Sequence, residues 1–166
     1  MASALFSDRA DTIRRRVLSP VGFRLFMWRQ LPLAGFAGLS LRSLDEGGCT
    51  VILPGGWRTQ NPFRSTYFAA QAMAAEMSTG APALVLVQGH EAKISLLVTE
   101  VRARYTKKIG GESQFTFREV GEMADVIERA AKTGEAATYL ARSVGRNETG
   151  DVASEFEIQW SFKRRD

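Results

Sequence analysis

The side chain with the clearest chemical potential is Glu76, because it lies in a segment, residues 61–80, that is rich in alanine and almost free of charge. At helical spacing this segment has no charged stripe, which predicts a helix buried on nearly all sides. A carboxylate on such a helix costs several kcal/mol unless it is paired, hydrogen-bonded or solvated by a cavity. Glu76 is therefore either a structural ion-pair partner of an arginine or a general base or nucleophile with raised basicity. The arginines available for such an ion pair are Arg58, Arg102, Arg104 and Arg142.

Polar residues also gather at the start of this segment. Asn61 precedes Pro62, an order typical of a helix cap followed by the first helical position. Asn61 is thus a cap or, alternatively, a group that orients water or a carbonyl. Thr66 and Tyr67 fall in the first turns of the expected helix. Free backbone N–H groups and the positive end of the helix dipole can polarise a carbonyl oxygen there.

Other catalytic and metal-binding motifs are missing from the sequence. His90 is the only histidine and Cys49 the only cysteine, so the sequence predicts neither a multi-ligand zinc site nor an internal disulfide. There is no P-loop, no G-x-S-x-G motif and no dinucleotide-binding glycine pattern. We therefore expect no metal and no tightly bound cofactor.

Length and composition indicate one domain, spanning residues 1–166, with enough apolar content for a full core. The net charge of +4 favours anionic partners, but the basic residues are scattered. Nucleic-acid binding is not expected, because the aromatic residues follow core-like periods instead of lying among the basic ones. The N-terminus lacks a signal-peptide pattern and no window is long enough to span a membrane. We expect a cytoplasmic protein without stable membrane insertion.

Residues 1–34 are expected to form a helical lead-in. Residues 7–18 read as a short helix with Ser7 or Asp8 as its cap, and Ser19-Pro20 starts a second helix that ends before Pro32. The second helix is aromatic on one side and carries Arg24 and Arg29 elsewhere. Packing against the domain is the preferred interpretation of this helix, and lying on a membrane surface is the alternative.

Residues 36–162 are expected to form the core of the domain. The patterns predict a hairpin over residues 39–53, the helix over 61–80, and strands over 83–87, 94–106, 114–118, 136–144 and 152–162. A short amphipathic helix over 120–130 ends at Gly134. One long helix cannot cover both faces of so large a sheet. We therefore predict an α+β fold in which a twisted antiparallel sheet wraps around one long central helix.

These features resemble the hotdog-fold thioesterases, in particular a branch related to the phenylacetate-pathway type. The resemblance rests on the order of elements over residues 36–162 and on one motif region. That region runs from Asn61 through the alanine-rich helix to Ala74-Ala75-Glu76 and Gly80, and the apolar run ALVLV follows it. The segment PVGFRLFMWRQLP also resembles the helical lead-in of that branch.

The resemblance implies a homodimer whose sheets join edge to edge, with a tetramer as the larger alternative, and two sites between the helices. Its substrate would be an acyl-CoA or acyl-carrier thioester, with coenzyme A present only as part of the substrate. Glu76 from the partner's helix would act as general base or nucleophile, and Asn61 would position water or the carboxylate. Thr66, Tyr67 and nearby amides would bound the oxyanion site. The residues implied for the coenzyme A phosphates are Arg102, Arg104 and Lys107.

The chain departs from the family pattern at the start of the helix. Many relatives carry a histidine there, whereas this chain has Tyr67, Phe68, Ala69 and Ala70. Backbone amides can still polarise a carbonyl because they require no particular side chain. The missing histidine favours the alternative function, a noncatalytic acyl- or lipid-binding protein on the same fold.

Overall fold

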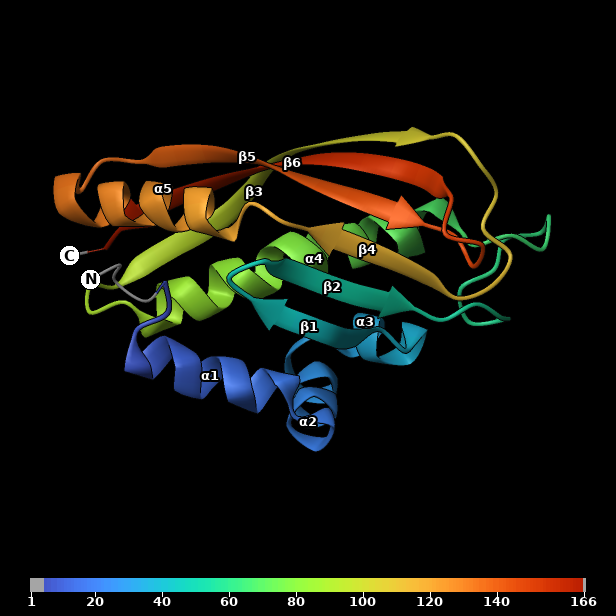
Figure 1. Cartoon of the computed structure of the whole chain (residues 1–166), viewed down its shortest axis with the longest axis horizontal. Helices are drawn as coiled ribbons and strands as arrows, with labels where there is room; N and C mark the ends of the chain where they lie inside the picture. Colours follow the sequence, from blue (N-terminus) through green and yellow to red (C-terminus); the bar gives the residue numbers. More distant parts are fainter. Residues whose placement is uncertain (1–4, 166) are drawn as a thin grey trace.

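The computed structural model describes residues 5–165, which form a sheet, a long helix and four further helices (Figure 1). Within these residues the sheet has six antiparallel strands in the order β1-β2-β4-β5-β6-β3. The strands are β1 (Ser40–Asp45), β2 (Gly48–Leu53), β3 (Ile94–Tyr105), β4 (Ser113–Phe117), β5 (Ala137–Arg146) and β6 (Val152–Arg164). The signal-peptide prediction depends partly on residues 1–4, which lie outside the described residues.

The N-terminal helices follow the sequence prediction closely. The helix α1 (Asp8–Leu18) is capped by the Ser7 side chain, and α2 (Pro20–Gln30) is capped by Ser19. Both caps place a hydroxyl oxygen on a free backbone N–H of the first turn. The short helix α3 (Pro32–Ala37) is not among the predicted elements, because the pattern marks Pro32 as the end of the preceding helix. Proline also suits the first position of a helix, and Pro32 occupies that position here.

The long central helix, α4 (Phe68–Gly89), differs from the prediction at both ends. It begins seven residues later than expected, because Asn61 stabilises a loop instead of a helix: its Oδ1 accepts hydrogen bonds from the backbone N–H groups of Phe63 and Ser65, at 2.9 and 3.2 Å. It also continues through Pro82, so the predicted strand over residues 83–87 is wrong. Those residues are apolar because α4 is enclosed on most sides, and a short apolar run does not distinguish a buried helix from a buried strand.

The sheet curves around α4, and its concave face carries the core (Figure 1). In the sequence of β6, the apolar residues Phe156, Ile158, Trp160 and Phe162 alternate with polar ones, which predicts that they share one face of the strand. All four are buried on the inward face. The helix α5 (Val120–Thr133) ends at Gly134 as expected and covers the sheet beside β5 and β6. The architecture is therefore the predicted α+β hotdog arrangement, a sheet wrapped around one long helix.

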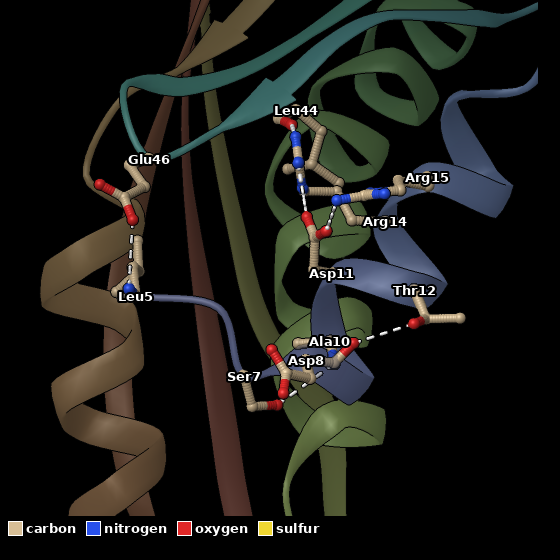
Figure 2. Close-up of polar contacts among 10 residues, drawn as sticks. All are labelled: Leu5, Ser7, Asp8, Ala10, Asp11, Thr12, Arg14, Arg15, Leu44 and Glu46. Atoms are coloured by element: carbon tan, nitrogen blue, oxygen red, sulfur yellow. Dashed lines mark hydrogen bonds and ion pairs between the residues drawn. The ribbon is translucent and has the colours of Figure 1, made fainter. Parts of the chain in front are cut away.

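The helix α1 joins the other elements through polar contacts as well as packing (Figure 2). Arg14 donates to the backbone oxygen of Leu44 in β1 at 2.9 Å and pairs with Asp11, which also pairs with Arg15. At the other end, the Ser7 hydroxyl donates to the Gly89 carbonyl, the last residue of α4, at 3.0 Å. These contacts attach α1 both to the edge strand β1 and to the end of α4 (Figure 1).

The strand β3 forms one edge of the sheet and pairs only with β6 among the described strands. It is 12 residues long and mostly exposed, and its exposed residues include Leu97, Val101 and Tyr105. A long edge strand with apolar side chains is a template for pairing with another strand. Among residues 5–165, no helix combines the length and hydropathy needed to cross a membrane; a cytoplasmic location stays a prediction.

Candidate functional site

Glu76 lies in the middle of α4, partly buried and without a charged partner. Across residues 5–165, no ion pair or hydrogen bond involves its carboxylate. The four candidate arginines lie elsewhere. Arg102 pairs with Glu100 and Arg142 with Glu157. Arg104 lines the same outer cleft as these two arginines, and Arg58 lies against Gly38. The interpretation of Glu76 as a structural ion-pair residue therefore has no support in the structure.

The Glu76 carboxylate lines a cavity of about 500 Å³ between α4 and the N-terminal helices. Two glutamines, Gln30 and Gln88, are the other polar side chains of its wall besides Glu76. The rest of the wall is apolar and comes from five elements: Val17 from α1; Phe23 and Phe26 from α2, with Leu31 just after it; Met77, Gly80, Ala81 and Leu84 from α4; Leu96 from β3; and Trp160 from β6. A mostly apolar cavity with few polar groups is the usual form of a site for a small organic ligand.

Gly80 and Trp160 fix the immediate surroundings of the carboxylate. A Cβ atom added to Gly80 would lie 3.0 Å from Oε1 of Glu76 and 3.2 Å from Cη2 of Trp160, so the carboxylate and the indole both border the space over this glycine. The Trp160 Nε1 donates a 3.0 Å hydrogen bond to the Thr79 hydroxyl, which itself donates to the Glu76 backbone oxygen at 2.9 Å. These hydrogen bonds fix the indole on the same wall of the cavity as the Glu76 carboxylate.

These surroundings raise the pKa of Glu76. The cause is desolvation, because burial disfavours the ionised carboxylate and no nearby cation offsets this effect. A carboxylate with a raised pKa is a stronger base than an exposed one once it is ionised, which suits it to remove a proton from water.

The raised pKa leads to a prediction on stability. The unfolded chain loses the Glu76 proton at a lower pH than the folded protein, so folded-state stability falls as the pH rises through the folded pKa. Glu76→Gln should therefore be more stable than the wild type at about pH 8, by on the order of 1 kcal/mol. The difference should vanish near pH 4, below the ordinary pKa of about 4.3. Urea unfolding at both pH values measures it, and an equal difference at both would contradict the desolvation of Glu76.

Asn61, Thr66 and Tyr67 lie together at the N-terminal end of α4. They line a second hollow of about 380 Å³, which Lys107 also borders. The late start of α4 changes their expected role, because their own amides are not free. The N–H of Thr66 donates to the Ile109 carbonyl and that of Tyr67 to the Thr59 carbonyl, both at 2.7 Å.

The free amides at this end of α4 belong to the next two residues. Tyr67 is the N-cap, and Phe68 and Ala69 occupy the first two helical positions. Within residues 5–165, neither of their amides donates a hydrogen bond, as is usual for the first turn of a helix. The carbonyl-polarising groups at this end are therefore the amides of Phe68 and Ala69, close to the predicted residues but not identical with them.

The predicted site residues fall into three places in one chain. Glu76 follows Tyr67 by nine positions, which places it about 14 Å along the helix axis, in a different cavity. Arg102 and Arg104 lie on the outer side of the sheet, in a cleft with Arg142, Glu155 and Glu157. Asn61, Thr66, Tyr67 and Lys107 are brought together within the chain, and Glu76 lies apart from both groups.

Sequence reasoning missed the residues that surround Glu76. Phe23, Phe26 and Gln30 share one side of α2, and their helical spacing was visible, but the spacing does not reveal which element they contact. Trp160 was expected as a core residue of β6, and its place beside the carboxylate follows only from the fold. Among the described residues, no three His, Cys, Asp or Glu side chains form a group that could hold a metal ion.

Comparison with solved structures confirms the fold. The chain superposes with a TM-score of 0.74 on a protein of unknown function from Chlorobaculum tepidum, at 17% identity over 89% of this chain and 98% of that one. It superposes with a TM-score of 0.71 on a Pseudomonas aeruginosa protein described as a probable thioesterase, at 19% identity over 88% of this chain and 97% of that one. For a thioesterase from Haemophilus influenzae the TM-score is 0.62, at 12% identity over 84% of this chain and 88% of that one.

Sequence comparisons place the chain in a family whose activity its description leaves open. No curated protein sequence matches the chain. The family described as a domain of unknown function, DUF4442, matches residues 21–161. This range includes α2 except Pro20, the sheet except the end of β6, and the linings of the Glu76 cavity, except Val17, and of the hollow at the start of α4. The phenylacetate-pathway branch stays a prediction. With more than four fifths of its residues matched, the chain belongs to the DUF4442 family and has a hotdog fold.

Proposed function

We propose that the protein hydrolyses a thioester, with Glu76 as the general base or nucleophile. The observation that carries this proposal is an ionisable carboxylate without a partner, desolvated in an apolar cavity of about 500 Å³. A structural carboxylate would be paired, whereas one that faces a cavity is available to act on a bound molecule. The likeness in fold to proteins described as thioesterases supports the reaction class.

The substrate we propose is an acyl-CoA or an acyl-carrier thioester. The phenylalanine, leucine and methionine side chains of the Glu76 cavity suit an apolar acyl chain. Lys107 and Lys108 border the hollow at the start of α4, where a phosphate-bearing thiol carrier would meet positive charge. Arg102 and Arg104 are a second basic group on the outer face of β3, and their contact with the carrier is a further part of the proposal.

The site we propose requires a homodimer. In one chain the free amides of Phe68 and Ala69 lie too far from Glu76 to act on the same carbonyl, because a reacting carbonyl has to be within hydrogen-bond reach of both. A second copy that pairs along β3 would offer its own Glu76 to these amides. The long exposed edge of β3, with Leu97, Val101 and Tyr105, supports such pairing.

Purified protein with a panel of acyl-CoA thioesters, short to long and aromatic, tests the proposal through detection of the free thiol. We expect turnover of at least one member that rises with pH as Glu76 ionises. Sedimentation of the same sample should show a dimer. A protein that is well folded but releases no thiol from any member, or a strict monomer, would contradict the proposal.

The second candidate function is noncatalytic binding of an acyl chain or lipid. It is favoured by the separation of Glu76 from the free amides within one chain and by Tyr67 and Phe68 in place of the family histidine. This function predicts an acyl compound that co-purifies with the protein, detected by native mass spectrometry, and no thiol release. Thiol release that depends on Glu76 would exclude it.

A further inference from the structure

The outward side of α2 carries apolar side chains that no other described element covers. Val21, Leu25 and Trp28 are 78%, 67% and 58% exposed. At 100° per residue they lie within about 60° of each other around the helix axis, on the side opposite the buried Phe23 and Met27. This helix is therefore apolar on both its inner and its outer side.

The apolar surface continues from α2 onto α3 and the loop after β2. A Cβ atom on Gly35 of α3 would lie 3.6 Å from Cδ2 of Trp28, so the indole lies against α3. Phe36 of α3 makes an edge-to-face contact with Trp57, with ring centroids 5.9 Å apart. Phe36 and Trp57 are 45% and 74% exposed. We call the surface formed by Val21, Leu25, Trp28, Phe36 and Trp57 the α2–α3 patch.

Positive charge borders the α2–α3 patch and negative charge is absent near it in the sequence. Arg24 and Arg29 lie about 40° beyond the two sides of the apolar stripe on α2. Residues 12–44 contain six arginines and no aspartate or glutamate. Arg14 and Arg15 pair with Asp11 of their own helix (Figure 2), and Arg42 pairs with Glu112. Arg24 and Arg29 make no ion pair within residues 5–165.

We propose that the α2–α3 patch docks on the surface of a lipid bilayer with anionic headgroups. A helix that presents an apolar stripe between two arginines lies in the plane of an interface, with the stripe in the acyl boundary and the arginines at the phosphates. Tryptophan favours this depth because its ring is apolar and its N–H is polar. A protein partner would more often complement exposed arginines with specific carboxylates, whereas a bilayer accepts any arrangement of them.

Docking would bring the Glu76 cavity next to the lipid. Phe23, Phe26 and Gln30 on the inner side of α2 form part of the cavity wall, while the outer side of the same helix carries the patch. An apolar ligand in the membrane would thus have to cross only the width of α2 to reach the cavity. The docking itself does not depend on thioester hydrolysis, and its test measures binding alone.

The tryptophans provide a direct measurement. Of the three tryptophans in the chain, Trp28 and Trp57 lie in the patch, while Trp160 is buried at 3% exposure. With vesicles of phosphatidylcholine and about 30% phosphatidylglycerol whose acyl chains are brominated, we expect quenched tryptophan emission. The double variant Trp28→Phe/Trp57→Phe should lose this quenching while keeping the Trp160 emission. Vesicles of phosphatidylcholine alone, or high salt, should weaken it.

Charge variants test the role of the arginines. Arg24→Glu/Arg29→Glu should lower binding to the anionic vesicles by at least about tenfold in flotation. The matched control is Arg118→Glu/Arg129→Glu, two exposed arginines far from the patch that change the net charge equally. The vesicle binding of the control variant should fall by less than about threefold, because only the change in net charge acts on it. Leu25→Ser supplies a second, uncharged test, and circular dichroism shows whether each variant is folded.

Three results would overturn the proposal. The first is the absence of quenching by brominated vesicles with the folded wild-type protein. The second is an equal loss of binding in the two charge-reversal pairs, which would show attraction by net charge without docking of the patch. The third is a pair of observations: the wild-type protein does not bind vesicles, and Leu25→Ser changes the oligomeric state. Together they would identify the α2–α3 patch as an interface between copies of the chain.

Discussion

Replacing Glu76 by glutamine is expected to lower the kcat of thioester hydrolysis by at least about 100-fold, the usual effect of losing a general base. Glutamine keeps the size and the position beside Gly80 and Trp160 but cannot accept a proton. Among residues 5–165, Glu76 is the only ionisable side chain in the wall of its cavity, so no neighbour of this part of the chain can replace it there. The KM should change little if the acyl chain binds through apolar contacts. Free-thiol detection under steady-state conditions measures both constants.

A matched control separates this effect from a general loss of charge. Glu91→Gln removes an exposed carboxylate outside the Glu76 cavity and should leave kcat unchanged. The wild-type pH profile provides a second control, because its acidic limb should follow the pKa of Glu76, which desolvation raises above the ordinary value. Wild-type turnover in a folded Glu76→Gln protein would remove Glu76 from the mechanism.

Gly89→Ala is expected to destabilise the folded protein, because it overpacks the contact between α1 and the end of α4. A Cβ atom on Gly89 would lie 2.4 Å from Cβ and 2.9 Å from the backbone nitrogen of Ala10, so α1 and the end of α4 could not remain in contact. The Ser7 hydroxyl also donates to the Gly89 carbonyl, and this bond would be lost as α1 moved. Overpacking of this kind costs about 1–3 kcal/mol of unfolding free energy. Urea denaturation measures the loss.

The control for this prediction is Gly121→Ala in α5. A Cβ atom there meets nothing within 4 Å, so alanine should be neutral or stabilise by up to about 1 kcal/mol through its helix propensity. The two substitutions add the same methyl group and are expected to act in opposite directions. A Gly89→Ala protein as stable as the wild type would mean that α1 does not pack on α4 as described.

Helices and strands with a regular pattern of apolar and polar residues were predictable from the sequence. The alternation of Phe156, Ile158, Trp160 and Phe162 identified β6 and its inward face, because successive side chains of a strand point to opposite sides. The caps of α1 and α2, and Gly134 after α5, marked helix ends through local chemistry. From these elements the sheet and its central helix followed, and with them the fold class.

The extent of α4 was decided by tertiary structure. Pro82 lacks an N–H donor and disfavours a helix interior, so local rules ended the helix near Gly80. The helix nevertheless runs to Gly89, because the residues beyond Pro82 are buried between the sheet and α1 in helical form. At the other end, the loop contacts of Asn61 and the hydrogen bond of Thr66 to Ile109 compete with helix formation. Such long-range partners are not visible in a local pattern.

The sequence by itself determined that Glu76 is a carboxylate on a helix with almost no other charge, because burial of a helix shows in its composition. Only the tertiary structure decided what that carboxylate faces. Its cavity is lined by Phe23 and Phe26 from one end of the chain and by Trp160 from the other. The physical reason is that periodicity fixes which side of an element is apolar, whereas the contact between two apolar sides depends on how the whole chain packs.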